Sequence, residues 1–265
     1  MNTHHATPDS TQASDTTPFA RRLPCHKVDA TAPFHWLALA VKDLRKTPLL
    51  SLLYGLAFSL IPAAIMYVAI ANQTHLTLLP AVVAFSLIGP IFAVGLYDVA
   101  WQLEKGERPS LGHSLRSVIR NPVGEWGFAL LLTILMIAWM RLAALIHALY
   151  PSIGEPSLAQ MMPFLLLGSV VGGVLMITVF ALSAFTPQIC LERRVDLMTA
   201  VTSSIHAVRE NLAAMTVWAG LILACVMFGF ATSAIGFIVV MPLLSFASWH
   251  AYIAVIATRR ERHYE

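Results

Sequence analysis

The sequence predicts an all-α polytopic membrane protein, with six transmembrane helices and three amphipathic helices on the cytoplasmic side. Three observations predict this class. Hydrophobic residues make up 57% and charged residues only 12% of the 265 residues, whereas soluble domains carry about 25% charged residues. The apolar residues come in blocks long enough to cross a bilayer. Lys and Arg residues gather between alternate blocks, as in proteins whose loops are sorted across a membrane.

The apolar blocks define the spans. About 20 apolar residues of helix cross the hydrocarbon core. The last block, from Leu212 to Ala257, contains no acid, Lys or Arg and has more than twice that length. It must therefore turn near Ala231 to Ala234 and form two spans. The predicted spans are 49–71, 78–101, 123–149, 158–185, 212–230 and 235–257.

These spans place a membrane domain over residues 31–257, between two polar tails. Residues 1–30 are rich in Thr, Ser, Asp, Ala and Pro and lack an apolar core, so we expect a disordered cytoplasmic tail. Residues 258–265 are charged and form a second cytoplasmic tail. The paired histidines of the first tail supply no fixed ligand geometry, and we expect no metal site and no cofactor.

The distribution of cations predicts the orientation. Every Lys and Arg residue except Arg141 lies before the first span, after the last span, or in the two long loops that follow spans two and four. The three other loops contain none. By the positive-inside rule, both termini and both long loops are cytoplasmic.

Amphipathic segments precede spans one, three and five. Residues 33–46 carry an apolar stripe with Trp36 suited to the headgroup zone, and residues 111–120 and 197–210 repeat the pattern, with Ser110 and Asp196 as helix caps. Such helices can lie in the membrane interface, although the same pattern also fits a connector packed against the protein. The cations predicted to contact lipid headgroups are Lys42, Arg45, Lys46, Arg116 and Arg120.

The order of these elements indicates an internal repeat. Amphipathic helix, span, short outer turn and span follow one another three times in one orientation. The copies share little sequence identity. The pattern therefore fits either a threefold repeat of two-helix units or convergence on one topology.

Two ionisable residues inside the spans are candidates for a functional site. Pro90 is followed after seven and eight residues by Tyr97 and Asp98, and Pro242 is followed at the same offsets by Trp249 and His250. Intramembrane ionisable groups are functional candidates, and Asp98 and His250 could share a proton. Alternatively, each side chain lies near the interface and contacts water or a headgroup.

Several strings resemble a known family. They are WLALAVKDLRKTPLLSLLYGL, IGPIFAVGLYDVAWQLEKGERPSL, VDLMTAVTSSIHAVREN and MPLLSFASWHAY. They resemble the domain of unknown function 2189 family of bacterial integral membrane proteins, over about residues 20 to 257. The resemblance implies a bacterial inner membrane location and no established activity.

The functional expectation is correspondingly general. The sequence contains none of the H-E-x-x-H, G-x-S-x-G or P-loop motifs, so we expect no enzyme and no catalytic residues. We expect a non-enzymatic membrane component that binds lipid or protein. Its partners would be anionic lipids and either another membrane protein or a second copy of the chain, without nucleic acid. The alternative is a small transporter or channel that uses Asp98 and His250, and a membrane enzyme with this pair as acid and base is a third reading.

Overall fold

The computed structural model describes residues 22–71, 92–117, 119, 122–148, 158–193 and 195–256. Among these residues the regular elements are helices, and one isolated antiparallel bridge joins Cys25 to Ile256. The predicted all-α class is confirmed. The tails predicted at the two ends of the chain lie largely outside the described residues.

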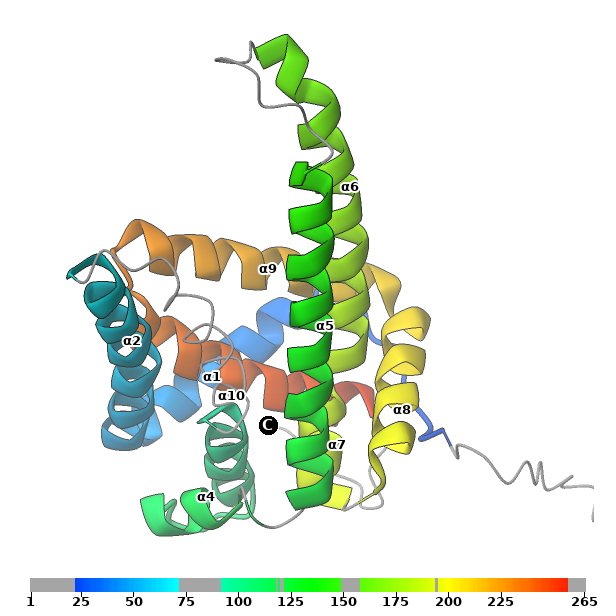
Figure 1. Cartoon of the computed structure of the whole chain (residues 1–265). Coiled ribbons are helices and arrows are strands. Elements are labelled where there is room, and N and C mark those ends of the chain that lie inside the picture. Colours follow the sequence, from blue (N-terminus) through cyan, green and yellow to red (C-terminus); the bar gives the residue numbers. More distant parts are fainter. Residues whose placement is uncertain are drawn as a thin grey trace, which may run out of the picture.

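Helices form at each predicted amphipathic segment and at the described part of each predicted span (Figure 1). Asp196 caps one of them as predicted, because its carboxylate accepts the backbone N–H of Thr199. The described helices are α1 (Ala32–Lys46), α2 (Pro48–Ala71), an unlabelled helix over residues 92–104, α4 (Leu111–Ser117), α5 (Pro122–Ala148), α6 (Leu158–Ser183), α7 (Thr186–Arg193), α8 (Leu197–Glu210), α9 (Leu212–Ala231) and α10 (Phe237–Val255).

Among the described residues, four helices are long and apolar enough to cross a membrane. A fifth is added if α1 and the first part of α2, which meet at 107°, form one bent span. The number six is not confirmed, because residues 78–91 of the predicted second span lie outside the described residues. The spans of the four helices are Val123–Ile146, Met162–Arg193, Leu212–Ala231 and Phe237–Val255.

The labelled helices form two main groups. Helices α5 to α8 pack against one another, and α1, α2, α9 and α10 pack against one another. In Figure 1, α5 and α6 form a long hairpin that extends beyond the other helices, while α9 and α10 run across it. The last helix, α10, packs against both α1 and α2. The backbones of α2 and α10 approach so closely that a Cβ on Gly55 would lie 1.9 Å from the carbonyl oxygen of Ile238. Glycine is therefore required at this crossing.

The core lies around α1 and α10, and its largest side chains are aromatic. Trp249, Tyr252 and Phe246 of α10 are fully buried. Trp36 is only 2% exposed and meets the Trp218 ring edge-on at 5.9 Å. The predicted headgroup position of Trp36 is therefore wrong, because α1 uses this face to pack on α9 and α10.

The segment before α1 forms a strap across three helices. The backbone N–H of His26 donates to Val255 of α10 at 2.7 Å, and the N–H of Leu23 donates to the Ser203 hydroxyl of α8. Asn211, between α8 and α9, accepts from the N–H of Val28 and donates to the carbonyl of His26. The strap thus joins the start of the described chain to its end.

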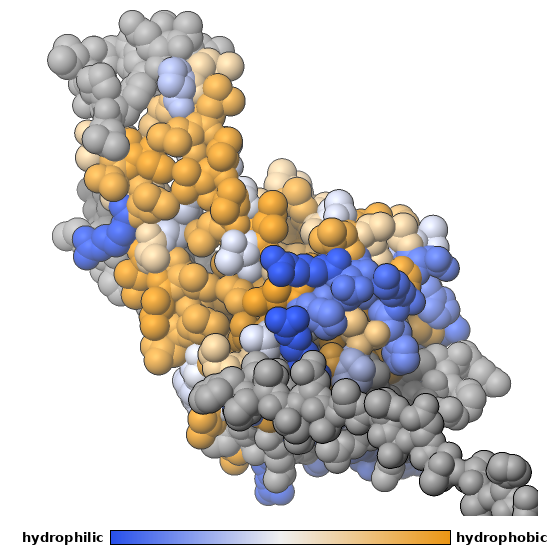
Figure 2. All heavy atoms as spheres, turned by 90° about the vertical axis from the view of Figure 1, so that its right-hand side faces the viewer, coloured by the Kyte–Doolittle hydropathy of each residue, from blue (hydrophilic) through white to orange (hydrophobic). Residues whose placement is uncertain are grey.

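The outer surface of the hairpin is apolar. Figure 2 shows apolar side chains covering the part of the molecule that projects beyond the body, with hydrophilic side chains gathered on the body below it. Exposed apolar residues of α6 include Leu166, Val170, Val174 and Ile177. A surface of this kind is stable in hydrocarbon and unfavourable in water.

Candidate functional site

Asp98 lies at the centre of a buried polar cluster. Its side chain is fully buried, and its Oδ2 lies 2.7 Å from His113 Nδ1 and accepts a 2.7 Å hydrogen bond from Gln102 Nε2. Gln102 is one helical turn further along the same helix, so both side chains share a face. The chain then reverses through Gly106, at a φ of 73°, which brings α4 and its His113 back over Asp98.

His250 has a carboxylate partner on a different helix. Its Nε2 lies 2.7 Å from Asp43 Oδ2, and both side chains are 11% exposed. Asp43 also lies 3.9 Å from the ammonium group of Lys46, one turn along α1. The pair therefore joins α1 to α10 at a position where both helices are buried.

Asp98 and His250, which the sequence left either paired with each other or facing the interface, each have a partner on another segment. Asp98 pairs with His113 and His250 pairs with Asp43. The offsets from the two prolines predicted depth along each helix, but the rotation of a helix depends on what packs against it. Both partners come from the predicted amphipathic segments, Asp43 from α1 and His113 from α4, and these segments contact the predicted spans.

The other two predicted site residues have contacts of their own. Tyr97 is 8% exposed and hydrogen-bonds through its side chain to Ser248 of α10. Trp249 is fully buried, donates from Nε1 to Glu104 Oε2 at 3.2 Å, and lies 6.1 Å from the Trp101 ring. The helix over residues 92–104 and α10 are therefore joined by polar and aromatic contacts.

A serine on α4 closes the polar cluster from the other side. Ser114 Oγ donates to the backbone carbonyl of Gly95 and lies 2.6 Å from Tyr54 Oη of α2. Since the serine proton is used by the carbonyl, the tyrosine hydroxyl donates to Ser114. This chain of hydrogen bonds fixes α4 to α2 and to the helix over residues 92–104.

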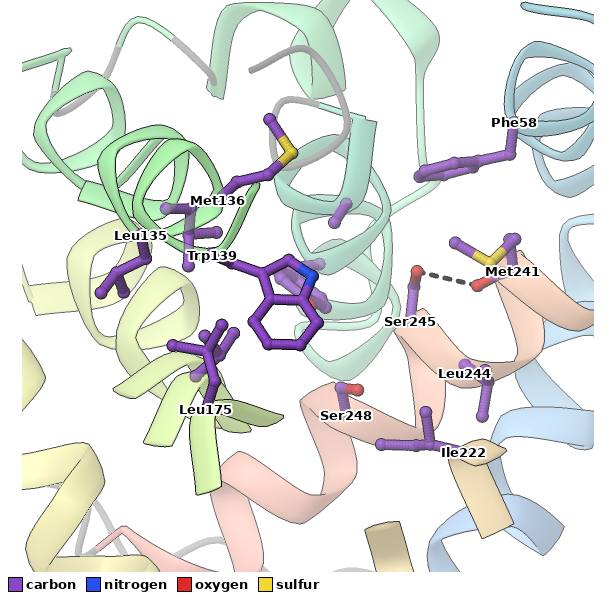
Figure 3. Close-up of a pocket in the computed structure, with 14 residues that line it drawn as sticks. Phe58, Leu135, Met136, Trp139, Leu175, Ile222, Met241, Leu244, Ser245 and Ser248 are labelled. Atoms are coloured by element: carbon purple, nitrogen blue, oxygen red, sulfur yellow. Dashed lines mark hydrogen bonds between the residues drawn. The ribbon is translucent and has the colours of Figure 1, made fainter. Parts of the chain in front are cut away.

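An apolar cleft of about 600 Å³ lies beside this cluster. Figure 3 shows Trp139 of α5 reaching into it, toward Ser248 of α10. Most polar side chains in its wall are already engaged, since Tyr97 bonds to Ser248 and the Ser245 hydroxyl donates to the carbonyl of Met241, and Trp139 adds an indole N–H. The lining residues are Phe58, Ala93, Tyr97, Leu132, Leu135, Met136, Trp139, Leu175, Val179, Ile222, Met241, Leu244, Ser245 and Ser248, and none of them is charged.

The cations predicted to contact headgroups are exposed wherever the structure describes them. Lys42, Arg45, Lys46 and Arg116 are exposed, and Arg120 lies outside the described residues. On α4, the apolar side chains of Leu111 and Leu115 are also exposed, at 39% and 52%. These side chains and the Arg116 cation are therefore available to a membrane surface.

Three residues of interest were missed by the sequence analysis. Asp43 and His113 were not singled out, although each lies 2.7 Å from one of the predicted site residues. Glu125 was counted within an apolar span, yet it is a carboxylate only 5% exposed in the first turn of α5. The signal for Glu125 was present, because an acid within an apolar block is uncommon. Among the described residues, no three His, Cys, Asp or Glu side chains form a group that could hold a metal ion.

Comparison with known proteins finds one family that matches part of the chain. The model of a family described as "Predicted integral membrane protein (DUF2189)" matches residues 78–192. The resemblance to this family is confirmed over these residues. The matched DUF2189 segment includes Asp98, His113, Glu125 and Trp139. No curated protein matches the chain. No solved structure matches it.

Proposed function

We propose that this integral membrane protein is a non-enzymatic lipid-binding component of a bacterial inner membrane. It has six spans, both termini are cytoplasmic, and the long loops after spans two and four are on the same side. The charge distribution supports this topology. Reporter fusions after Glu107 and Asp196 should read as cytoplasmic and a fusion after Ser233 as periplasmic, and a periplasmic signal at Glu107 would refute it.

The observation that carries the proposal is the cleft between α5 and α10. Its volume of about 600 Å³ is within the range of ligand pockets. Because its wall has no charged residue and its hydroxyl groups are already hydrogen-bonded, the ligand it favours is largely apolar. The cleft lies between helices apolar enough to span a bilayer. The apolar ligand that surrounds such helices is the acyl chain of a membrane lipid.

The exposed cations of α1 and α4 support a preference for lipids with anionic headgroups. Lys42, Arg45 and Lys46 lie together near the end of α1, and Arg116 lies on α4 beside exposed leucines. Cations near a membrane surface attract anionic headgroups by about 1 kcal/mol each. The proposed ligand is therefore a lipid with an anionic headgroup and an acyl chain that enters the cleft.

Quenching by brominated lipid tests this proposal. The protein in detergent is mixed with about one equivalent of phosphatidylglycerol brominated on one acyl chain, and tryptophan fluorescence is recorded. Bromine near Trp139 should quench a fraction of the emission, and Trp139→Phe should remove that fraction. Ala93→Phe, which fills the cleft, should abolish the quenching, whereas Ala138→Phe on the exposed face of α5 should leave it unchanged.

The headgroup is tested in the same assay. Replacing Lys42, Arg45, Lys46, Arg116 and Arg120 with Gln should weaken quenching by phosphatidylglycerol and leave quenching by brominated phosphatidylcholine unchanged. Quenching that neither Trp139→Phe nor Ala93→Phe alters would overturn the cleft as the binding site. Solute flux in proteoliposomes that Asp98→Asn abolishes would instead support the transporter alternative.

A further inference from the structure

Glu125 is a buried acid that the proposed lipid site does not use. It lies in the first turn of α5 and is 5% exposed. Among the described residues, neither of its carboxylate oxygens has a hydrogen-bond partner. This differs from Asp98 and Asp43, which each pair with a histidine.

In the part of the chain that the structure describes, no group donates a hydrogen bond to the Glu125 carboxylate. Its charge lies close enough to act on Tyr97 and on Cys190 of α7. On α7, which packs against α5, the side-chain carbonyl oxygen of Gln188 is also buried and has no partner in the described part of the chain. The α5–α7 contact therefore contains buried acceptors for which the structure shows no donor.

The described charged groups of the neighbouring elements are Arg193 and Glu192 of α7, Asp196, and groups in the last two turns of α8. Helices α6, α7 and α8 pack against α5. Arg193 of α7 lies 4.0 Å from Glu192, and Asp196 is an acid engaged as the cap of α8. Helix α6 carries no ionisable side chain. The remaining ionisable groups of α8 are His206, Arg209 and Glu210, in its last two turns.

We propose that Glu125 is a proton-binding site of the membrane domain. An ionised carboxylate in a low-dielectric interior without a donor or a cation is strongly unfavourable. A proton removes this cost and supplies a donor that the neighbouring acceptors can use. Glu125 lies within electrostatic range of Tyr97, whose ring forms part of the cleft wall, so binding and release of the proton would act on a residue of the proposed lipid site.

The experiment uses dicyclohexylcarbodiimide, an apolar reagent that reacts with protonated carboxyl groups. The acid adds across the carbodiimide, its proton moves to nitrogen, and acyl transfer gives a stable N-acylurea that retains the whole reagent. The full-length protein in detergent is treated at a series of pH values and digested, and the adduct is located by mass spectrometry. Glu125 should be labelled at about pH 7, where an ordinary glutamate of pKa about 4.3 is ionised. Labelling should fall as the pH is raised further and the carboxyl group loses its proton.

Matched variants show whether the label depends on this residue. Glu125→Gln should remove the adduct from its peptide and preserve the fold, since the amide has the same shape and no charge. Asp196→Asn should leave labelling of Glu125 unchanged, because Asp196 is an exposed cap.

A second measurement tests the proposal even if the reagent cannot reach Glu125. The thermal midpoint of the wild-type protein should fall relative to that of Glu125→Gln as the pH rises from about 6 to about 9, because ionisation leaves an unpaired buried charge. Labelling at neutral pH, or divergence of the two stability curves, supports the proton site. Absence of labelling together with parallel stability curves overturns it.

Discussion

His250 Nε2 lies 2.7 Å from Asp43 Oδ2, which joins the last described helix to the first. Both groups are largely buried, so neither can exchange its partner for water at low cost. The contact between α1 and α10 therefore depends on this pair as well as on apolar packing.

Asp43→Asn and His250→Gln should each destabilise the protein, and the double variant should lose less than the sum of the two. A coupling of about 1–3 kcal/mol is expected for residues in direct contact. Unfolding of each variant in mixed micelles measures it. The control is Asp98→Asn combined with His250→Gln, for which the losses should add. A larger coupling in the control would support the shared Asp98–His250 site that the sequence left open as one alternative.

Ser114→Ala should destabilise the protein by about 1–3 kcal/mol. The substitution leaves Tyr54 Oη without its buried acceptor and the carbonyl of Gly95 without its donor. Thr216→Ala is the matched control, since Thr216 is exposed and its hydroxyl bonds only to its own helix. Thermal unfolding in detergent compares the two, and equal effects would show that the Ser114 bridge contributes nothing specific.

Gly55→Ala should disrupt the crossing of α2 and α10. The added methyl group would lie 1.9 Å from a backbone oxygen, which cannot move without displacing α10. Overpacking of this kind costs about 1–3 kcal/mol. Gly220→Ala in α9, where nothing lies within 4 Å, should be neutral or stabilising. Comparable midpoints for the two variants would argue against the close crossing.

Asp196→Ala should destabilise α8 by about 0.5–2 kcal/mol, the usual value of an N-cap. Hydrogen bonds from the backbone N–H and the hydroxyl of Thr199 hold the pKa of Asp196 below its usual value. A carboxyl group with a lowered pKa stabilises the folded state above its unfolded-state pKa, and this contribution is lost as the pH falls through the folded-state pKa. The stability difference from Asp196→Ala should therefore persist at neutral pH and shrink below about pH 4. A difference that stays constant down to about pH 2 would show that ionisation of the cap is irrelevant.

The helices themselves were largely predictable. Predicted spans 123–149 and 212–230 correspond to α5 (Pro122–Ala148) and α9 (Leu212–Ala231) within a few residues. The agreement arises because charged or polar residues interrupt the apolar blocks at their ends, and the bilayer thickness sets the length between them. The predicted turn between the last two spans is also present, and Ser233 adopts a positive φ there.

The contacts between helices could not be predicted in the same way. Asp98 and His250 were placed at one depth, but the side of each helix that faces a neighbour depends on all the side chains that pack there. Asp43 and Lys42 are neighbours in sequence, yet successive residues of a helix point in directions about 100° apart, and Asp43 is buried whereas Lys42 is exposed. Trp36 suits an interface by its chemistry, and only the position of Trp218 reveals that it is buried.

The strap has a consequence for the order of assembly during synthesis. His26 and Val255 are joined by a backbone hydrogen bond, and α1 packs mainly on α10, so the early segments find their partners only when the late ones have been made. Contacts between positions so distant in sequence close slowly. Until α10 has been synthesised, the faces of α1 that carry Trp36 and Asp43 must contact lipid, water or a chaperone. The hairpin of α5 and α6 has no such requirement, because its two helices are neighbours in sequence and can associate as soon as both have entered the bilayer.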